Sequence, residues 1–161
     1  MKPYFEDKHN QEEFLKLLDT WKGVPYEHMG ESKSGIDCSK LLGKLLLEMG
    51  ILNGNLEKVY KAPDWYLSSK KEVLLEFVNL TLKEHLNKKD FYFMKIPTPN
   101  ELRFGDFLFF AIASSGVCNH SAIYLGEERI FHCLTNRHCC YDQLNFSWKK
   151  RIAWAYRLML W

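Results

Sequence analysis

Apolar residues recur at helical spacing in three stretches of the first 90 residues. The first stretch predicts a helix from a cap at Asn10 to Trp21, and the second predicts a helix from Cys38 to Met49. The third has an apolar stripe from Val73 to Leu86, with a predicted cap at Ser68-Ser69 and an end at Asn87–Asp90. The N-terminal part of the chain is therefore expected to be helical.

The pattern changes after Gly105, where short runs rich in Phe, Ile and Tyr predict strands. Gly126–Glu128 has the composition of a hairpin turn between two of these runs. Helices that precede an antiparallel sheet indicate the α+β fold class. The predicted strands are Phe107–Ala113, His120–Leu125, Arg129–Leu134 and Ala153–Leu158.

The chain shows no internal repeat and no low-complexity linker, so we expect one domain over residues 1–161. The final residues, Arg157–Trp161, do not have the composition of a soluble tail and predict an edge strand.

Composition excludes several classes of protein. The chain has 22 Lys and Arg against 20 Asp and Glu, a formal net charge of +2, and its charges are mixed rather than clustered, which argues against nucleic-acid binding. The longest apolar runs are too short to cross a membrane, and the polar start lacks the apolar core of a signal peptide. We therefore expect a cytoplasmic protein, with release from the cell or association with a phage as alternatives.

Cys38 stands where the second helix begins, between Asp37 and Ser39. The positive end of a helix stabilises a thiolate, which is the nucleophilic form of cysteine. The same backbone amides can stabilise an oxyanion during acyl transfer. The alternative is a small buried cysteine in a helix capped by Asp37, without chemistry.

His120 and His132 fall on the two strands that the predicted turn at Gly126–Glu128 connects. This turn predicts that His120 lies opposite residue 132 or 133, with the two imidazoles on one face of the sheet. One imidazole could then serve as a base for Cys38 and the other could orient it. Two half-buried structural histidines are the alternative.

A metal site is a competing hypothesis for the same part of the chain, because soft ligands are dense between Cys118 and Cys140. Adjacent residues on a strand point to opposite faces, so His132 and Cys133 are not expected to bind one ion. No zinc-binding spacing is recognisable, and we expect no metal. The odd number of cysteines, five, also argues against a disulfide scaffold.

Four ordered motifs resemble the NlpC family of papain-like cysteine peptidases. The segment WKGVPYEHMGESKSGIDCSKLL is similar to the family signature, with Tyr26 twelve residues before Cys38. GDFLFF, HSAIYLG and IFHC follow in the family's order. The resemblance implies a papain-like fold, a single catalytic domain with a helical insertion at about residues 55–100, and an amide hydrolase without metal or organic cofactor.

The resemblance also implies roles for individual residues. Family members of this type usually cut peptidoglycan stem peptides after a γ-linked D-glutamyl residue, through a thioester. Cys38 would be the nucleophile, His120 the base, His132 the residue that orients it, and Tyr26 a hydroxyl near the oxyanion, while Asp37 and Ser39 would shape substrate subsites. Trp65, in the insertion, is a candidate for stacking on substrate.

The sequence departs from the family pattern around the predicted groove. Lys40 follows D-C-S where glycine is usual, and Ser121-Ala122 replaces a glycine-containing segment after the base histidine. Other functions therefore stay open: acyl transfer to a lipid or protein amine by the same thiol, a non-catalytic binding module, or a zinc-binding structural domain. An apolar groove around residues 69–89 would favour acyl transfer.

Overall fold

The computed structural model describes residues 1–56, 65, 69–97, 99–113 and 116–161. Within these residues seven strands form one antiparallel sheet in the order β1-β9-β5-β6-β7-β8, and β4 also pairs with β9. The strands are β1 (Lys2–Pro3), β4 (Phe91–Lys95), β5 (Phe107–Phe110), β6 (His120–Tyr124), β7 (Arg129–Cys133), β8 (Cys139–Gln143) and β9 (Ile152–Leu160).

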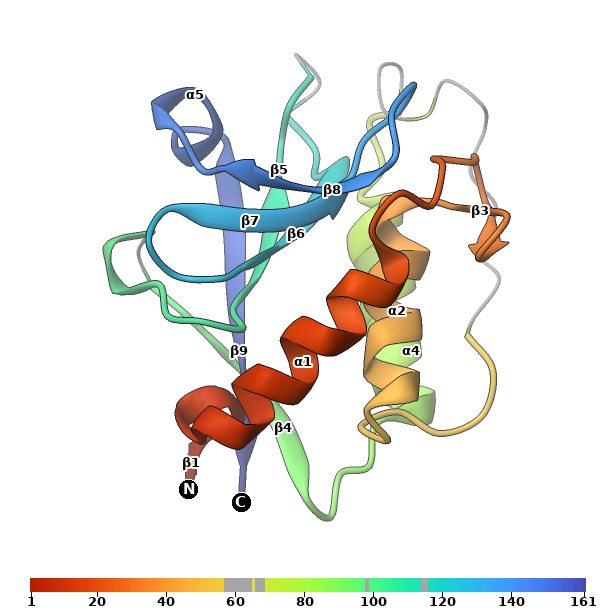
Figure 1. Ribbon diagram of the computed structural model, residues 1–161. Helices are drawn as coiled ribbons and strands as arrows, with labels where there is room; N and C mark the ends of the chain where they lie inside the picture. The colour runs from red at the N-terminus through yellow and green to blue at the C-terminus, as the bar shows by residue number, and fades with distance from the viewer. Residues whose placement is uncertain (57–64, 66–68, 98, 114–115) are drawn as a thin grey trace.

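The helices lie on both sides of this sheet. Figure 1 shows α1 (Lys8–Trp21), α2 (Cys38–Glu48) and α4 (Val73–His85) together on one side and the short α5 (Phe146–Lys149) on the other. Short 3-10 helices at Tyr4–Glu6 and Pro99–Glu101, and a small hairpin of β2 (Glu31–Ser32) and β3 (Gly35–Ile36), complete the described elements. The expected α+β class, with N-terminal helices packed on an antiparallel sheet, is confirmed.

Successive side chains of each strand point to opposite faces of the sheet, and both faces are apolar. Phe107, Phe109, Ile123 and Phe131 pack against buried residues of α1, α2 and α4 in the main core. Their strand neighbours form a smaller core on the opposite face, where Trp148 of α5 packs against it. The members of this second core are Ile96, Leu108, Phe110, Ala122, Ile130, Leu144 and Ala155.

The first helix begins earlier than the sequence predicts. Its N-cap is Asp7, whose carboxylate accepts a hydrogen bond from the backbone N–H of His9 (2.8 Å). Asn10 lies inside the helix and donates its side-chain N–H to the carbonyl of Tyr4 (2.9 Å). The predicted cap at Asn10 is therefore wrong, because Asn10 ties the helix to the preceding 3-10 turn instead.

The second helix begins at Cys38 as predicted, with Asp37 as N-cap and Met49 as C-cap. Gly50 follows with φ 71°, a left-handed conformation that ends helices and favours glycine.

The third helix begins later than expected, at Val73, and ends at His85. Of its predicted capping pair, Ser68 lies outside the described residues. The hydroxyl of Ser69 accepts a hydrogen bond from the N–H of Lys71 (3.1 Å), so it stabilises the turn before the helix and does not cap it.

The four predicted strands are present, with ends that differ by a few residues. The structure adds β4 and a full strand β8, and it contradicts the predicted edge position of the C-terminal strand. Tyr156 of β9 pairs with both Phe107 of β5 and Lys95 of β4, so this strand has a partner on each side.

Among the helices that the structure describes, none combines the length and the apolar character needed to cross a lipid bilayer.

Candidate active site

The helix side of the site is built from four consecutive residues. Cys38 is the first residue of α2 and is 2% exposed. The carboxylate of Asp37 accepts hydrogen bonds from the N–H of Lys40 (2.8 Å) and from the hydroxyl of Ser39 (2.7 Å). These bonds stabilise the first turn of the helix, at whose start the thiol lies, through contacts between neighbours in the sequence.

Asp37 and Ser39 are fully buried and bonded to each other, with exposed fractions of 0% and 1%. The structure therefore gives both residues a role in stabilising the helix start. Their predicted role in shaping substrate subsites stays a prediction.

The sheet side of the site carries the two histidines. His120 is the first residue of β6, and His132 lies in β7 directly opposite Ala122. The predicted register, with His120 opposite residue 132 or 133, is therefore wrong by one or two residues. The histidines are diagonal neighbours on one face instead, and Nε2 of His120 lies 3.0 Å from Nδ1 of His132. Diagonal neighbours on a sheet are close enough for aromatic rings to meet.

Two contacts bring these sides together. The hydroxyl of Ser121 in β6 donates to the carbonyl of Cys38 (3.0 Å), which ties the strand to the helix start. The N–H of Tyr26 donates to the carbonyl of Arg137 (3.0 Å), which ties the loop before α2 to the loop before β8. The loop and the strand ends therefore converge around the thiol.

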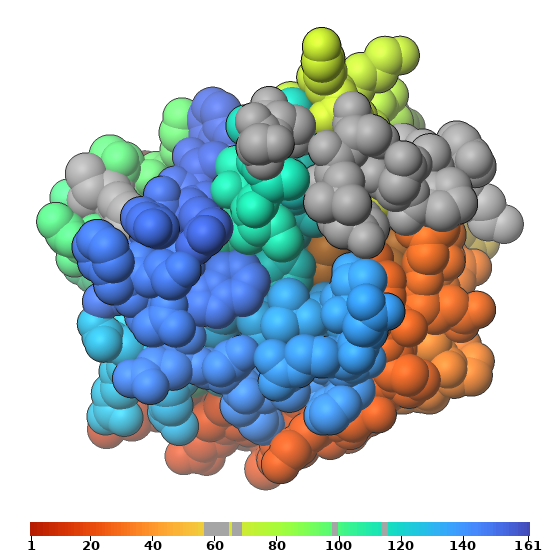
Figure 2. Space-filling model, turned by 90° about the horizontal axis from the view of Figure 1, so that it is seen from above, coloured from red at the N-terminus to blue at the C-terminus, as the bar shows by residue number. Residues whose placement is uncertain are grey.

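A pocket of about 230 Å³ lies at this convergence and contains both Cys38 and His120 in its wall. Figure 2 views this end of the molecule, where the loop after β7 (light blue), the segment after β5 (teal) and the N-terminal region (orange) meet on one face. The lining residues are Tyr26, Cys38, Ile112, Asn119, His120, Leu134, Thr135 and Arg137.

Burial controls the charge of the site. Burial and the neighbouring His132 lower the pKa of His120 well below its ordinary value. Burial also lowers the pKa of His132 to about 4, although the carboxylate of Asp142 opposes this shift. Both imidazoles are therefore neutral near pH 7. Burial, and then the neighbouring Cys38 and Asp37, raise the pKa of Tyr26, so its hydroxyl keeps its proton.

Trp148 of α5 covers the histidine pair from the outer side of the sheet. Its ring centroid lies 5.4 Å from the centroid of His120 and 5.4 Å from that of His132. Phe110 packs against both rings, with its centroid 5.8 Å from that of His120 and 5.1 Å from that of Trp148. These rings exclude water from the imidazoles, which accounts for their lowered pKa values.

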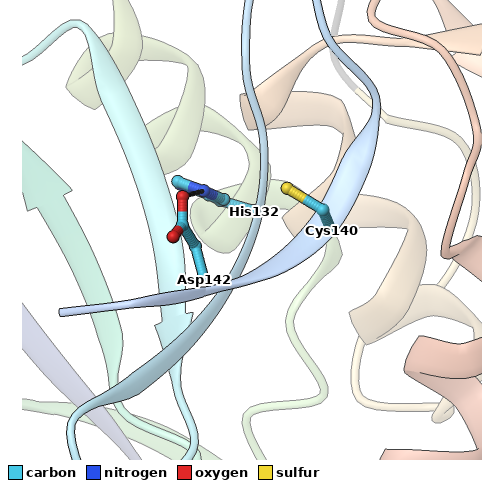
Figure 3. Close-up of side chains that lie close together, drawn as sticks. All are labelled: His132, Cys140 and Asp142. Atoms are coloured by element: carbon cyan, nitrogen blue, oxygen red, sulfur yellow. Dashed lines mark ion pairs between the residues drawn. The ribbon is translucent and has the colours of Figure 1, made fainter.

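Sequence reasoning missed two charged residues beside the pair. Oδ2 of Asp142 in β8 lies 3.4 Å from Nε2 of His132 and 3.5 Å from a guanidinium nitrogen of Arg137. Figure 3 shows the Asp142 carboxylate against the His132 ring, with Cys140 on the same strand as Asp142. A second hairpin, with a turn near Asn136 (φ 61°), could have indicated this strand from the sequence.

The metal hypothesis can be tested against this cluster. Among the residues that the structure describes, His132, Cys140 and Asp142 offer ligand atoms within 4.8 Å of one another. Arg137 already places a positive charge on Asp142, which disfavours a cation at this position. As expected from strand geometry, Cys133 points to the other face, where its sulfur lies 3.6 Å from the carbonyl oxygen of Ile36.

All five cysteines lie in the described part of the chain, and each is a buried thiol outside any disulfide. A hydrogen bond with Cys139, and then burial, raise the pKa of Cys133. Burial and nearby Glu72 raise the pKa of Cys118 to about 12, and burial raises that of Cys140. These three thiols are therefore poor nucleophiles at neutral pH.

Trp65 is 3% exposed and packs in the main core with α1 and α2. It is not among the residues that line the pocket with Cys38. The structure therefore gives it a packing role and does not bring it to the site predicted for it.

Comparison with known proteins gives one family. The family model described as "NlpC/P60 family" matches residues 23–157. No curated protein matches the chain by sequence.

Solved structures share the fold at low identity. The chain is similar to the NlpC/p60 domain of the peptidoglycan hydrolase SagA (TM-score 0.55, 18% identity, covering 90% of this chain and 96% of that one). It is similar to NlpC2 from Trichomonas vaginalis (TM-score 0.60, 16% identity, covering 90% and 44%). It is also similar to RipD from Mycobacterium tuberculosis, described as a non-catalytic NlpC/p60 domain protein adapted to peptidoglycan binding (TM-score 0.52, 16% identity, covering 91% and 95%).

At these identities the likeness establishes the fold, and the expected papain-like architecture is confirmed. The chain spans nearly all of the SagA domain but less than half of four other similar structures, of which it covers 39% to 44%.

Proposed function

The chain belongs to the NlpC/P60 family, and from this premise we propose that it is a cysteine peptidase or amidase acting on peptidoglycan stem peptides. The bond cleaved is the amide that follows a γ-linked D-glutamyl residue. One observation carries the proposal: a helix-start thiol and a neutral imidazole line the same pocket, and a second imidazole is within hydrogen-bonding distance of the first. The SagA domain, described as part of a peptidoglycan hydrolase, supports this choice of substrate.

In the proposed mechanism His120 acts first as a base. Its Nε2 is engaged with His132, so Nδ1 is the nitrogen left to take the proton of the Cys38 thiol. The thiolate attacks the carbonyl carbon of the substrate amide and forms a tetrahedral oxyanion. The protonated His120 then gives its proton to the leaving amine, and a thioester remains on Cys38.

A water molecule completes the reaction. His120, neutral again, removes a proton from the water as it attacks the thioester carbonyl. The second tetrahedral intermediate collapses, the acyl–sulfur bond breaks, and the product carboxylate leaves the regenerated thiol. His120 is therefore the base, and Cys38 the carrier of the acyl group, in both the acylation and the hydrolysis of the thioester.

Two features support stabilisation of the oxyanion. Cys38 begins α2, so the positive end of the helix lies at the reacting sulfur. Tyr26 lines the same pocket, and its raised pKa keeps the hydroxyl protonated and able to donate a hydrogen bond.

Lys40, where the family usually has glycine, is buried and lies 3.4 Å from Glu31, so it joins the hairpin of β2 and β3 to the helix.

An apolar acyl-binding groove would favour acyl transfer over hydrolysis. An apolar pocket lies between α2, α4 and the sheet, but its volume of about 60 Å³ is only a few water molecules and far smaller than an acyl chain. It does not include Cys38 in its lining. Hydrolysis therefore remains the function that the geometry supports best.

The non-catalytic alternative has a specific observation behind it, because RipD has the same fold and is described as non-catalytic. Binding of peptidoglycan without turnover would then be the function of the scaffold. Cys38 and His120 favour catalysis, and activity decides between the two.

The test is hydrolysis of a soluble stem peptide that contains a γ-D-glutamyl bond, followed by mass spectrometry of the products. We expect cleavage by the wild type and a loss of roughly 10⁴-fold or more in Cys38→Ala. Cys118→Ala is the matched control, because this thiol is also buried but lies outside the pocket. An active Cys38→Ala variant would exclude the thiol mechanism, and wild-type binding without cleavage would favour the non-catalytic alternative.

A further inference from the structure

Three polar side chains form a line across three neighbouring strands. His120 lies on β6, His132 on β7 and Asp142 on β8, and all three point to the same face of the sheet. The register sets this line, because His132 is directly opposite Cys140 and Asp142 follows two residues later. The first contact is 3.0 Å, between the two rings, and the second is 3.4 Å, between Nε2 of His132 and Oδ2 of Asp142.

One proton lies between the two rings, and its position decides whether His120 can react. Nδ1 of His120 can accept the thiol proton only if the neutral ring carries its own proton on Nε2. That proton must then be donated to His132, so Nδ1 of His132 has to be the acceptor. His132 therefore has to carry its proton on Nε2. The wrong tautomer of His132 would place a proton on Nδ1 of His120 and stop it from acting as a base.

Asp142 is the group that favours the required tautomer. Nε2 of His132 is buried and has no hydrogen-bond partner among the described residues, and the nearest charged atom is the carboxylate oxygen at 3.4 Å. An N–H directed at a carboxylate is attracted to it, whereas a nitrogen lone pair is repelled. Arg137 lies 3.5 Å from the same carboxylate oxygen and stabilises its negative charge. Among the described residues, His120, the thiol of Cys140 and the ring of Trp148 also lie close to His132, and none of these three carries a negative charge at neutral pH.

We propose that Asp142 is a positioning residue for the reaction: it holds His132 with its proton on Nε2 and thereby leaves His120 free to accept the proton of Cys38. This inference rests on the proposed function for its catalytic meaning. Its structural content, the tautomeric state of two histidines, does not depend on any substrate.

The first experiment reads the tautomers directly. The full chain, labelled with ¹⁵N-histidine, is studied near pH 7 by long-range ¹H–¹⁵N correlation, which distinguishes a protonated ring nitrogen from an unprotonated one. We expect both His120 and His132 to carry the proton on Nε2. A wild-type spectrum in which His132 carries its proton on Nδ1 would overturn the proposal, whatever the protein hydrolyses.

The second experiment removes the carboxylate. In Asp142→Ala we expect the His132 signals to move toward the Nδ1-protonated form and kcat for the stem peptide to fall roughly tenfold, with KM changed less than twofold. Asp142→Asn should restore part of both properties, because its amide oxygen still presents a partial negative charge to Nε2. The Asp142 side chain is one-third exposed, so these variants do not open a core cavity.

Asp19→Asn is the matched control. Asp19 accepts a hydrogen bond from the hydroxyl of Tyr141 (2.6 Å), the residue next to Asp142 on the same strand, and lies outside the pocket. It should leave the tautomers and kcat unchanged. Unchanged histidine signals in folded Asp142→Ala would refute the positioning role. If the tautomers shift as expected but the wild type hydrolyses no peptide, the proposed function fails and the role of Asp142 stands.

Discussion

The two sides of the pocket are built in opposite ways. On the helix side, Asp37 fixes Cys38 through hydrogen bonds to its immediate neighbours Ser39 and Lys40. On the sheet side, His120, His132 and Asp142 meet only because three strands pair in one register. The helix start at the nucleophile is thus capped by local structure and tied to the sheet through Ser121, whereas the base is positioned by long-range structure throughout.

Because of this difference, substitutions on the two sides of the pocket should have different effects. A local cap involves few residues, so its loss weakens one helix turn. A strand register is shared by the whole sheet, and a slip of one residue would turn every side chain of the strand to the other face. We therefore expect loss of the helix cap to affect mainly the local stability of the helix start, and changes to the histidines to affect the chemistry.

Apart from loss of the nucleophile itself, the largest effect is expected from removing the base. His120→Ala should lower kcat/KM by roughly 10³-fold, because neither Cys38 nor water can then lose its proton to a positioned imidazole. Alkylation of Cys38, followed by peptide mapping of all five cysteines, should show that its excess reactivity over Cys118 is lost as well. His9→Ala, on the exposed start of α1, is the control. Wild-type alkylation kinetics in His120→Ala would show that the helix side alone activates the thiol.

A pH series tests the burial of the histidine pair. The unfolded chain binds a proton on His132 near pH 6.5, whereas the folded chain does so only near pH 4. The stability tied to neutral His132 is therefore complete above about pH 6.5 and is lost as the pH falls toward 4, up to about 3 kcal/mol by that point. His120, whose pKa is also lowered, adds to the same trend.

Urea unfolding between pH 7.5 and 4.5 measures this loss. The slope of the free energy of unfolding against pH should become shallower in His132→Asn, because asparagine takes up no proton in the folded or the unfolded state. Equal slopes in the variant and the wild type would mean that His132 is not held neutral by burial.

The smallest effect is expected from the helix cap. Asp37→Ala should lower the free energy of unfolding by about 2 kcal/mol, because it removes both the cap and the buried hydrogen bond from the Ser39 hydroxyl. Asp7→Ala removes the more exposed cap of α1 and should cost about 1 kcal/mol or less. Denaturant titration compares the two, and equal losses would show that the buried hydrogen bonds of Asp37 add nothing to an ordinary cap.

The helix side could be predicted from the sequence because its signals are contiguous. Asp37, Cys38 and the apolar stripe of α2 stand within one short segment, and each is a local indicator of a helix start. The same holds for the turn at Gly126–Glu128, where the N–H of Arg129 donates to the carbonyl of Gly126 (2.9 Å).

The sheet side could be predicted only in part. The turn indicated which strands pair but not their register, since the positive φ values of Glu127 and Glu128 shift the pairing relative to a minimal turn. Strand β8, which carries Asp142, is short and follows a polar segment. Its sequence lacks the run of Phe, Ile and Tyr that marked the other strands. The inner position of β9 depends on β4, which is far away in the sequence and was not predicted.

The helix α4 and the strand β4 fall within the predicted helical insertion at about residues 55–100. That this segment is an insertion stays a prediction. Trp65 illustrates why such residues are hard to assign from sequence. A tryptophan can equally stack on a ligand or fill a core, and its burial in the main core selects the second.

The pairing of β1 with the end of β9 brings the two ends of the chain together, Lys2 opposite Leu160. Figure 1 places both ends at the bottom of the molecule, whereas α2 begins near the top. A tether joined to either end would thus attach on the side of the molecule remote from the Cys38 thiol. The protein could be anchored to a bead or a sensor surface with its pocket facing outward, toward a polymer too large to diffuse.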